Sequence, residues 1–292
     1  MSATHMPVER ARPILGTLVS IRVEGLPEKR ANQAIDAGFA EVAHIHALMS
    51  FHEAKSDVSR LNRTAATRAV RIHSDTFAVL RRAVEMAAVS DGVFDPTIGG
   101  RLVSWGFLPP PVGAPKPAPR ASWRDIELIL PDKVRFHRPL WIDLGGIAKG
   151  YAVDRAIARM ALNPKVQCCV NAGGDLRIAG PRAERVLLRV APTDGMVPVV
   201  EIENGSIASS SGRESRKKRG KQFVGPHVDT HHRRAMGTRS FVSVIAPNCL
   251  DADALTKVVL ALGARSDAVL RQFGAVAYLN AGRGWRTLGA EL

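Results

Sequence analysis

Segments typical of β-strands outnumber segments typical of helices in this chain, and their order limits the folds it can adopt. Strands are predicted where apolar and polar residues alternate, or where short apolar runs are bounded by turn residues. The predicted strands lie within 18–23, 126–130, 133–137, 140–144, 166–180, 185–192, 197–211 and 275–285. The predicted amphipathic helices are 27–49, 57–61, 75–91, 148–161, 252–262 and 265–273. Because helices and strands do not alternate at the regular spacing of a parallel sheet, the pattern favours a mixed α+β fold.

One domain over residues 1–292 is the predicted organisation. The chain is 46% apolar, which is sufficient for a substantial core. Residues 108–120 hold six of the 18 prolines and predict a stiff, extended surface loop. We interpret this loop as an insertion and not as a linker between domains, because glycine-rich motifs lie on both sides of it.

A second unusual segment, the basic segment 213–239, contains nine Lys or Arg against two acidic residues, a net charge of +7. A solvated loop is the default interpretation. Docking of an acidic acceptor protein and binding of nucleic acid are the functional alternatives. Nucleic acid is the less favoured of the two, because Phe223 alone could stack on a base there.

Composition also bears on location and partners. No apolar run is long enough to span a membrane, and the first twenty residues lack the pattern of an export signal. We therefore expect a cytoplasmic protein, with export as the alternative if the start of the chain is incomplete. The cysteines, Cys168, Cys169 and Cys249, show neither a disulfide framework nor a metal-binding spacing, and we expect them to be buried. The net charge of +14 favours anionic partners without choosing among them.

Adjacent glycines follow an apolar run at Gly145 and Gly146, and a lysine and a helix come directly after them. Missing side chains let a ligand approach the backbone, and a helix start presents free amides and a partial positive charge. Lys149 adds a full charge, so this turn predicts an anion site, with a tightly packed turn as the alternative. Similar glycine pairs occur in 94–100 and 171–175, whereas the nucleotide motif GxxxxGK[ST] is absent.

Seven motifs together carry a resemblance to a known family. In order they are ILGT, SDVSRLN, FDPTIGGRLVSWGF, IDLGGIAKGYAVDRA, VNAGGD, SIASSSG and VIAPNCLDADALTKVVLALG. From about residue 12 onward the chain resembles the ApbE family of FAD:protein FMN transferases. The resemblance implies mixed, largely antiparallel sheets with flanking helices. It also implies that FAD binds with its pyrophosphate at Mg²⁺, and that FMN is transferred to a threonine of a target protein while AMP is released.

The resemblance also assigns residues to the FAD site. The implied cofactor-binding residues are Gly16, Thr17, Asn62, Asp95, Thr97, Asp143, Gly145, Gly146, Lys149, Asn171, Gly173, Gly174, Asp175, Ser211 and Gly212. Lys257, which departs from the family pattern, is a further candidate for binding the cofactor. The implied metal ligands are Asp253, the backbone oxygen of Ala148 and the hydroxyl of Thr256. For Asp95 and Asp175 the alternative is a turn carboxylate bonded to its own backbone.

The cation site departs from the family pattern, which has a threonine four residues after the aspartate. Lys257 occupies that position here, and Thr256 comes one residue earlier. Positions three and four residues along a helix both neighbour Asp253. Two alternatives therefore stay open: Thr256 completes a magnesium site, or the ammonium of Lys257 takes the place of the metal.

Three residues are candidates for a direct part in the chemistry. Lys149 and Arg216 could neutralise phosphate charge, Arg216 standing four residues after Gly212 as the resemblance implies. His227 could act as a base toward the acceptor threonine, because a histidine pKa lies close to working pH. The family pattern His-x-x-Asp-Pro is not kept here, since one residue alone separates His227 from Asp229 and no proline follows, so an exposed loop histidine is the alternative.

Two other functions use the same pocket. Water in place of the threonine would make the protein an FAD hydrolase that yields FMN and AMP. Loss of activity at the two altered motifs would leave an FAD-binding or basic-segment binding protein.

Overall fold

The computed structural model describes residues 6–188, 197–211, 217–219, 222–229, 234–235, 240–282 and 284–289. Its central element is an eight-stranded sheet in the order β1-β2-β6-β7-β10-β15-β16-β17. Neighbouring strands pair antiparallel throughout this sheet. The strands are β1 Val8–Ile14, β2 Thr17–Glu24, β6 Gln167–Ala172, β7 Asp175–Ala179, β10 Ser206–Ser211, β15 Phe241–Ala246, β16 Val276–Asn280 and β17 Trp285–Leu288. The predicted α+β class with largely antiparallel sheets is confirmed.

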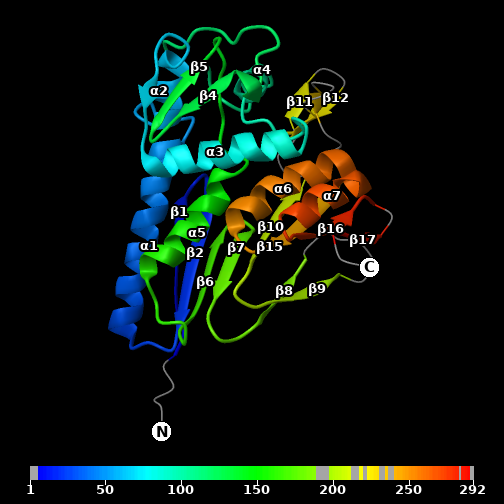
Figure 1. Cartoon of the computed structure of the whole chain (residues 1–292). Coiled ribbons are helices and arrows are strands. Elements are labelled where there is room, and N and C mark those ends of the chain that lie inside the picture. The colour runs from blue at the N-terminus through cyan, green and yellow to red at the C-terminus, as the bar shows by residue number, and fades with distance from the viewer. Residues whose placement is uncertain are drawn as a thin grey trace.

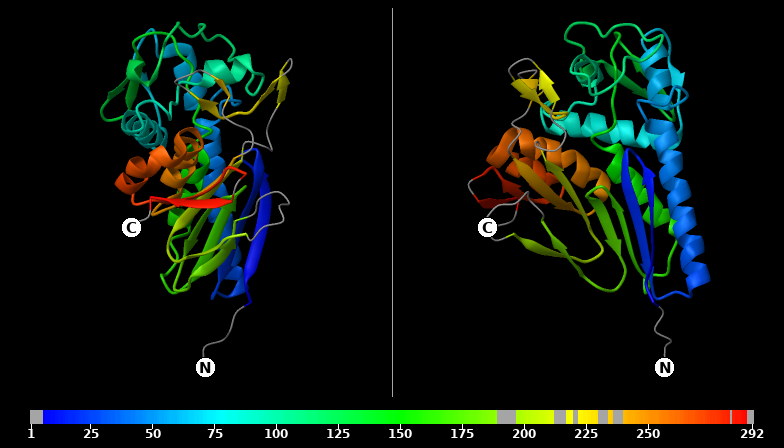
Figure 2. Two further views of the ribbon diagram at one scale, coloured as in Figure 1. Left: turned by 90° about the vertical axis from the view of Figure 1, so that its right-hand side faces the viewer. Right: turned by 180° about the vertical axis from the view of Figure 1, so that it is seen from behind.

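Helices cover one face of the main sheet, as Figures 1 and 2 show. They are α1 Glu28–Met49, α5 Ala148–Met160 and α6 Cys249–Leu262, followed by the short helices η2 Gly263–Ser266 and α7 Asp267–Gln272. Alternate residues of each strand point into this layer because side chains change face at every residue of a strand. On β2, for example, Val19, Ile21 and Val23 are buried in the core beneath the helices.

The opposite face of the sheet has a smaller apolar cluster. A hairpin of β8 Glu184–Leu187 and β9 Val199–Ile202 packs there, with Val200 and Ile202 against Ile178 and Ile207 of the sheet. Ile245 of β15 belongs to this cluster, whereas its neighbours Val244 and Ala246 belong to the helical side. Successive side chains along a strand thus point into two different apolar clusters, one on each face of the sheet.

A second group of elements, residues 51–141, lies above the helical layer in Figure 1, and we call it the small lobe. It contains a three-stranded sheet in the order β3-β5-β4. Its elements are α2 Asp57–Thr64, β3 Val70–Arg71, α3 Ser74–Val89, α4 Gly99–Ser104, η1 Trp123–Asp125, β4 Ile126–Ile129 and β5 Lys133–Phe136. Val134 and Phe136 are buried in the same apolar cluster as the main sheet. That continuity favours the single domain, which stays a prediction.

The lobe is also tied to the helical layer by charge. Arg82 of α3 donates two hydrogen bonds to Asp251 of α6, Nε to Oδ1 at 2.7 Å and Nη2 to Oδ2 at 2.8 Å. Asp251 is buried, so this two-point pair is shielded from water and fixes the angle between the two helices.

One expectation about strands was wrong, and one strand was not predicted. The apolar run 140–144 forms no strand, because its backbone groups bond to side chains and loops and not to a neighbouring strand. Conversely, β1 escaped prediction because its middle residues are exposed and polar, as is common on the edge of a sheet. The predicted helix start at Ser56 is confirmed, since its hydroxyl accepts a hydrogen bond from Ser59 N.

The two unusual segments behave differently. Residues 109–111 and 114–118 of the proline-rich loop carry no helix, strand or turn, and the loop is anchored where Trp141 Nε1 donates to Pro115 O at 2.8 Å. The basic segment, expected as a loop, contains two short antiparallel pairs. They are β11 Lys217–Arg219 with β12 Gln222–Val224, and β13 Val228–Asp229 with β14 Arg234–Ala235.

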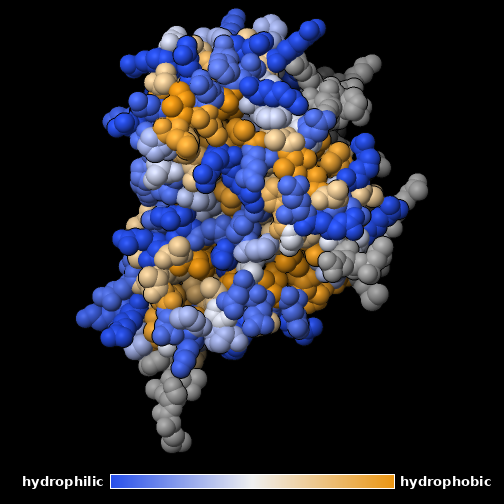
Figure 3. Space-filling model, viewed as in Figure 1, coloured by the Kyte–Doolittle hydropathy of each residue, from blue (hydrophilic) through white to orange (hydrophobic). Residues whose placement is uncertain are grey.

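Hydrophilic side chains predominate on the face shown in Figure 3, and apolar patches lie between them. Within the described residues, no helix combines the length and the apolar composition needed to cross a membrane.

Candidate active site

A cavity of about 810 Å³ opens between the main sheet, the helical layer and the small lobe. Such a volume is typical of small-molecule sites. Its walls come from the β1–β2 turn, the end of α1, the loops before α4 and α5, the end of β10, the basic segment and α6. Predicted site residues found in the lining are Gly16, Asp95, Asp143, Gly145, Gly146, Ala148, Lys149, Gly173, Ser211, His227 and Lys257. The fold therefore brings predicted site residues that are far apart in the sequence, from Gly16 to Lys257, around one cavity.

The floor of the cavity is the segment before α5, and Asn62 holds it in place. Asn62 Nδ2 donates to Ile142 O at 3.0 Å, and Asn62 Oδ1 accepts from Ile142 N at 2.8 Å. The next residue, Asp143, donates its backbone N–H to Pro96 O at 2.8 Å. Asn62 is buried and does not line the cavity. Its two hydrogen bonds pair the backbone N–H and C=O of Ile142, as a neighbouring strand would in a sheet.

Gly145 and Gly146 provide space and not an unusual backbone, because neither has a left-handed φ. A Cβ on Gly145 would lie 3.2 Å from Asp143 Oδ2, and one on Gly146 would lie 3.5 Å from Lys257 Cε. The side chain of Lys257 thus passes Gly146, and a side chain larger than Ala at position 146 would occupy the same space. Burial raises the pKa of Asp143, although the charges of His52 and Lys257 oppose this.

Helices α5 and α6 meet where Gly150 removes any side chain. A Cβ there would lie 2.1 Å from Cys249 O, closer than atoms can approach. The contact places Gly150 N 3.2 Å from Asp253 Oδ2, to which it donates. Ala148 N donates to Leu144 O at 2.8 Å, so at least two amides at the start of α5 already have partners. We therefore assign the positive charge offered to a ligand mainly to lysine side chains.

Two buried carboxylates and two lysines form the charged end of the cavity. Lys149 donates to Asp175, and its Nζ lies 3.6 Å from Asp253 Oδ2. Lys257 donates to Asp253 Oδ1 and, at 2.9 Å, to Asp253 O. The Asp175 and Asp253 side chains are 2% and 0% exposed, whereas those of Lys149 and Lys257 are 31% and 15% exposed. The acids are thus covered while both ammonium groups reach the cavity.

The protonation states follow from these pairs. Burial would lower the pKa of Lys149, but Asp253 and Asp175 outweigh it and raise that pKa above the ordinary value. Burial would raise the pKa of Asp253, but Lys149 and Lys257 outweigh it and lower that pKa. At neutral pH Lys149 is therefore a cation and Asp253 an anion.

Thr256 is turned away from the cavity. Its hydroxyl donates to Asp253 O at 2.7 Å and lies 2.8 Å from Ser210 Oγ. The side chain is fully buried and does not line the cavity. Thr256 therefore joins α6 to β10.

His227 lies at the wall formed by the basic segment, next to Pro226 and Val228. Burial lowers its pKa to about 4, and the charges of Lys257 and Lys149 act in the same direction. The negative charge of Asp253 opposes them. His227 is therefore neutral near pH 7 and free to accept a proton, but its pKa is not close to working pH as expected from the sequence, because burial disfavours the charged imidazole.

Of the remaining predicted residues, Asp95 lines the cavity, whereas Thr97, Asn171 and Gly174 belong to turns and do not line it. Asp95 Oδ1 accepts from Thr97 N at 2.8 Å and from Thr97 Oγ1 at 2.7 Å, which is the turn arrangement named as the alternative. Burial raises the pKa of Asp95. Asn171 Oδ1 accepts from Gly174 N at 2.9 Å in the β6–β7 turn. Gly212 and Arg216 lie outside the described residues.

The β1–β2 turn has Leu15 and Gly16 as its central residues, and Thr17 opens β2. Both turn residues have left-handed φ, 59° and 70°, as tight hairpins require. Thr17 packs directly on Gly173, where a Cβ would lie 2.3 Å from Thr17 Oγ1. The turn is thereby fixed against the VNAGGD motif.

Sequence reasoning missed one whole wall of the cavity. It is formed by the end of α1 and the residues after it, including His46, Met49, Phe51 and His52. The available signal was Phe51, an apolar residue in a short polar connector, which is buried. The helix periodicity could not show which side of α1 faces a ligand.

Comparison with known proteins identifies relatives over nearly the whole chain. The profile of the ApbE family matches residues 15–279. The FAD:protein FMN transferase of Treponema pallidum is 27% identical, over 91% of this chain and 82% of that protein. That of Rhodobacter capsulatus is 29% identical over 86% of this chain, which spans 50% of the relative. The crystal structure of the ApbE protein from Thermotoga maritima superposes with a TM-score of 0.83 at 24% identity, covering 94% of both chains.

Replacing Asn62 with Ala should destabilise the protein, because two buried backbone groups of Ile142 lose their partners. We expect the free energy of unfolding in urea to fall by about 2–4 kcal/mol. Asn163→Ala is the matched control, since this exposed asparagine accepts one bond from Lys165 N at 2.9 Å and should cost less than about 1 kcal/mol. Equal stability of Asn62→Ala and the control would contradict the supporting role of Asn62.

Proposed function

The chain belongs to the ApbE family, and from this premise we propose that it binds FAD in the cavity and transfers FMN to a threonine hydroxyl of an acceptor protein. AMP is the second product. The observation that carries the proposal is the convergence of the three glycine-pair motifs and two lysines on one cavity of about 810 Å³. Lys149 and Lys257 supply positive charge where a pyrophosphate would bind.

The reaction needs a phosphorus atom held between an attacking and a leaving oxygen. The threonine oxygen forms a bond to the FMN phosphorus while the bond from that phosphorus to the AMP oxygen breaks. The hydroxyl proton passes to a base, and AMP leaves with the bonding electrons. Lysines beside the phosphates stabilise the charge that develops on the oxygens. Neutral His227 can accept the proton, and Arg216 stays a predicted phosphate ligand.

The predicted Mg²⁺ ligands were tested against the donor set of the site. Mg²⁺ needs free oxygen ligands in octahedral arrangement. Asp253 Oδ1 receives Lys257, Asp253 Oδ2 receives Gly150 N, and Thr256 is bonded to Ser210 and to the Asp253 carbonyl. These residues do not fit the ion as they stand, so the reaction above includes no metal step.

An acidic protein surface is our prediction for the acceptor. The basic segment has a net charge of +7 and contributes Pro226, His227 and Val228 to the cavity wall. An acceptor with acidic residues around its threonine would be attracted to this entrance. Nucleic acid remains the less favoured partner. A cytoplasmic location also stays a prediction, in keeping with three free cysteines.

The transfer is tested by incubating the purified protein with FAD and a cell extract freed of small molecules. We expect flavin fluorescence on a protein band after denaturing electrophoresis, and peptide mass spectrometry should find FMN on a threonine. Asp253→Asn keeps the size of the side chain but removes the charge that holds both lysines, so transfer should fall at least about a hundredfold. Release of FMN and AMP without labelled protein would support the hydrolase alternative.

The pH dependence of transfer tests His227 as the base. A base works in its deprotonated form, and His227 has a pKa of about 4. The rate should therefore stay level from pH 8 to about pH 6 and fall only as the pH approaches 4. His227→Gln should be slow at every pH, with circular dichroism used to confirm folding. A rate that halves near pH 6.5, an ordinary histidine pKa, would contradict this environment.

A further inference from the structure

Lys257 occupies a fixed position at the charged end of the cavity. Its Nζ bonds both the carboxylate and the carbonyl oxygen of Asp253, and its side chain is 15% exposed. The arm passes Gly146, where its Cε lies within 3.5 Å of the position that a Cβ would take. A lysine held at two points and along its stem loses little further freedom when a ligand arrives.

The cluster is balanced in charge before any ligand binds. Lys149 and Lys257 carry two positive charges, and Asp175 and Asp253 can carry two negative charges. An ammonium group has three donor hydrogens. Lys257 uses two of them toward Asp253 and Lys149 uses one toward Asp175, so each ammonium group keeps at least one donor for the cavity. A divalent cation on Asp253 would lie beside the Lys257 ammonium and would have to displace it.

We infer that Lys257 is the resident cation of this pocket, so that the protein binds the FAD pyrophosphate without a divalent metal. The inference rests on the proposed function, because it takes FAD as the ligand. One phosphate oxygen accepts from Lys257 and a second accepts from Lys149. Asp253 orients the first lysine and Asp175 the second.

Flavin fluorescence titration of the metal-stripped protein with FAD tests the inference in magnesium and in a chelator. The wild-type dissociation constant should differ by less than about twofold between the two buffers. Lys257→Thr should bind about ten- to a hundredfold more weakly in chelator, and magnesium should restore most of that loss. Lys165→Thr makes the same change of charge at an exposed site and should behave as wild type.

Manganese binding gives a second readout that needs no flavin. Electron paramagnetic resonance should detect no Mn²⁺ bound by the wild type at this site and one ion bound by Lys257→Thr. Wild-type binding of one Mn²⁺ that Asp253→Asn abolishes, or at least tenfold tighter FAD binding in magnesium, would overturn the inference. If no variant binds FAD in either buffer, the proposed function fails, while the manganese result still decides the role of Lys257.

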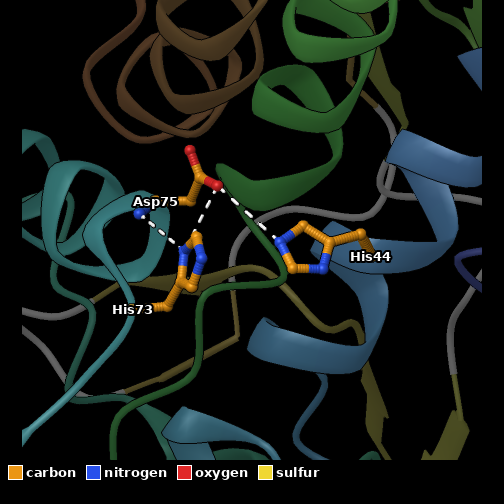
Figure 4. Close-up of side chains that lie close together, drawn as sticks. All are labelled: His44, His73 and Asp75. Atoms are coloured by element: carbon orange, nitrogen blue, oxygen red, sulfur yellow. Dashed lines mark hydrogen bonds and ion pairs between the residues drawn. The ribbon is translucent and has the colours of Figure 1, made fainter.

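A separate group of side chains lies outside the cavity, where α1 meets the start of α3 (Figure 4). Asp75 Oδ2 is 3.3 Å from His73 Nδ1 and 3.9 Å from His44 Nε2. Ligands about 2.0–2.1 Å from a tetrahedral zinc ion are about 3.3 Å apart. The distance from His73 to Asp75 matches this spacing. The distance from His44 to Asp75 would have to shorten by about half an ångström.

A hydrogen bond from α5 orients the Asp75 carboxylate. Tyr151 of α5 donates its hydroxyl to Asp75 Oδ1 at 2.5 Å, which leaves Oδ2 toward the histidines. Zinc ligands are commonly supported by such a bond. The His44 and His73 side chains are 44% and 42% exposed, so an ion can reach them and they can adjust.

We propose that His44, His73 and Asp75 bind one Zn²⁺ ion, with water completing the coordination. Two imidazoles and a carboxylate are a donor set that zinc favours. His73 Nδ1 would exchange its 3.2 Å bond from Asp75 N for the metal. The ion would join α1 to α3.

Calorimetric titration of the metal-free protein with Zn²⁺ tests this site. We expect one ion to bind and the melting temperature to rise. His44→Ala and His73→Ala should each weaken binding at least about tenfold, and Tyr151→Phe should weaken it less. His137→Ala, an exposed histidine elsewhere, should have no effect. Absence of binding, or binding that survives both histidine variants, would overturn the proposal.

Discussion

The buried carboxylate of Asp253 is the interaction on which the rest of the site depends. It lies where α5 and α6 touch, and it receives Gly150 N and the two lysines of the cavity. An uncompensated buried charge is costly, so the helices and both ammonium groups are held together. The absence of a side chain at Gly150 allows this approach, because any Cβ would collide with Cys249 O. The close packing of the two helices therefore also provides a hydrogen-bond donor for the buried charge of Asp253.

The small lobe completes the cavity through side-chain bonds and not through strand pairing. Asn62 substitutes for a neighbouring strand along Ile142, and Arg82 fixes α3 to the buried Asp251 of α6. These contacts set the position of Asp143 and of the turn after it, which face the lysines across the same space. The two parts therefore share one apolar cluster and line one cavity.

Sequence patterns predicted the elements better than their partners. The alternation of β2 and the periodicity of α1 and α6 were sufficient, because local burial decides them. The run 140–144 has the composition of a buried strand. Its buried backbone groups at Ile142, however, form hydrogen bonds with an asparagine 80 residues away in the sequence and not with a neighbouring strand. The edge strand β1 has no apolar alternation to detect, and its pairing with β2 is supplied by the hairpin turn.

The sequence by itself determined the α+β class, the family resemblance and the motifs that supply the cavity, because these depend on residue types and spacing. It left the cation question open, since positions 256 and 257 both neighbour Asp253 on a helix. The tertiary structure decided that Thr256 faces β10 and that Lys257 faces the cavity. The direction of a helix face toward its neighbours is set by packing between distant segments, which no local pattern contains.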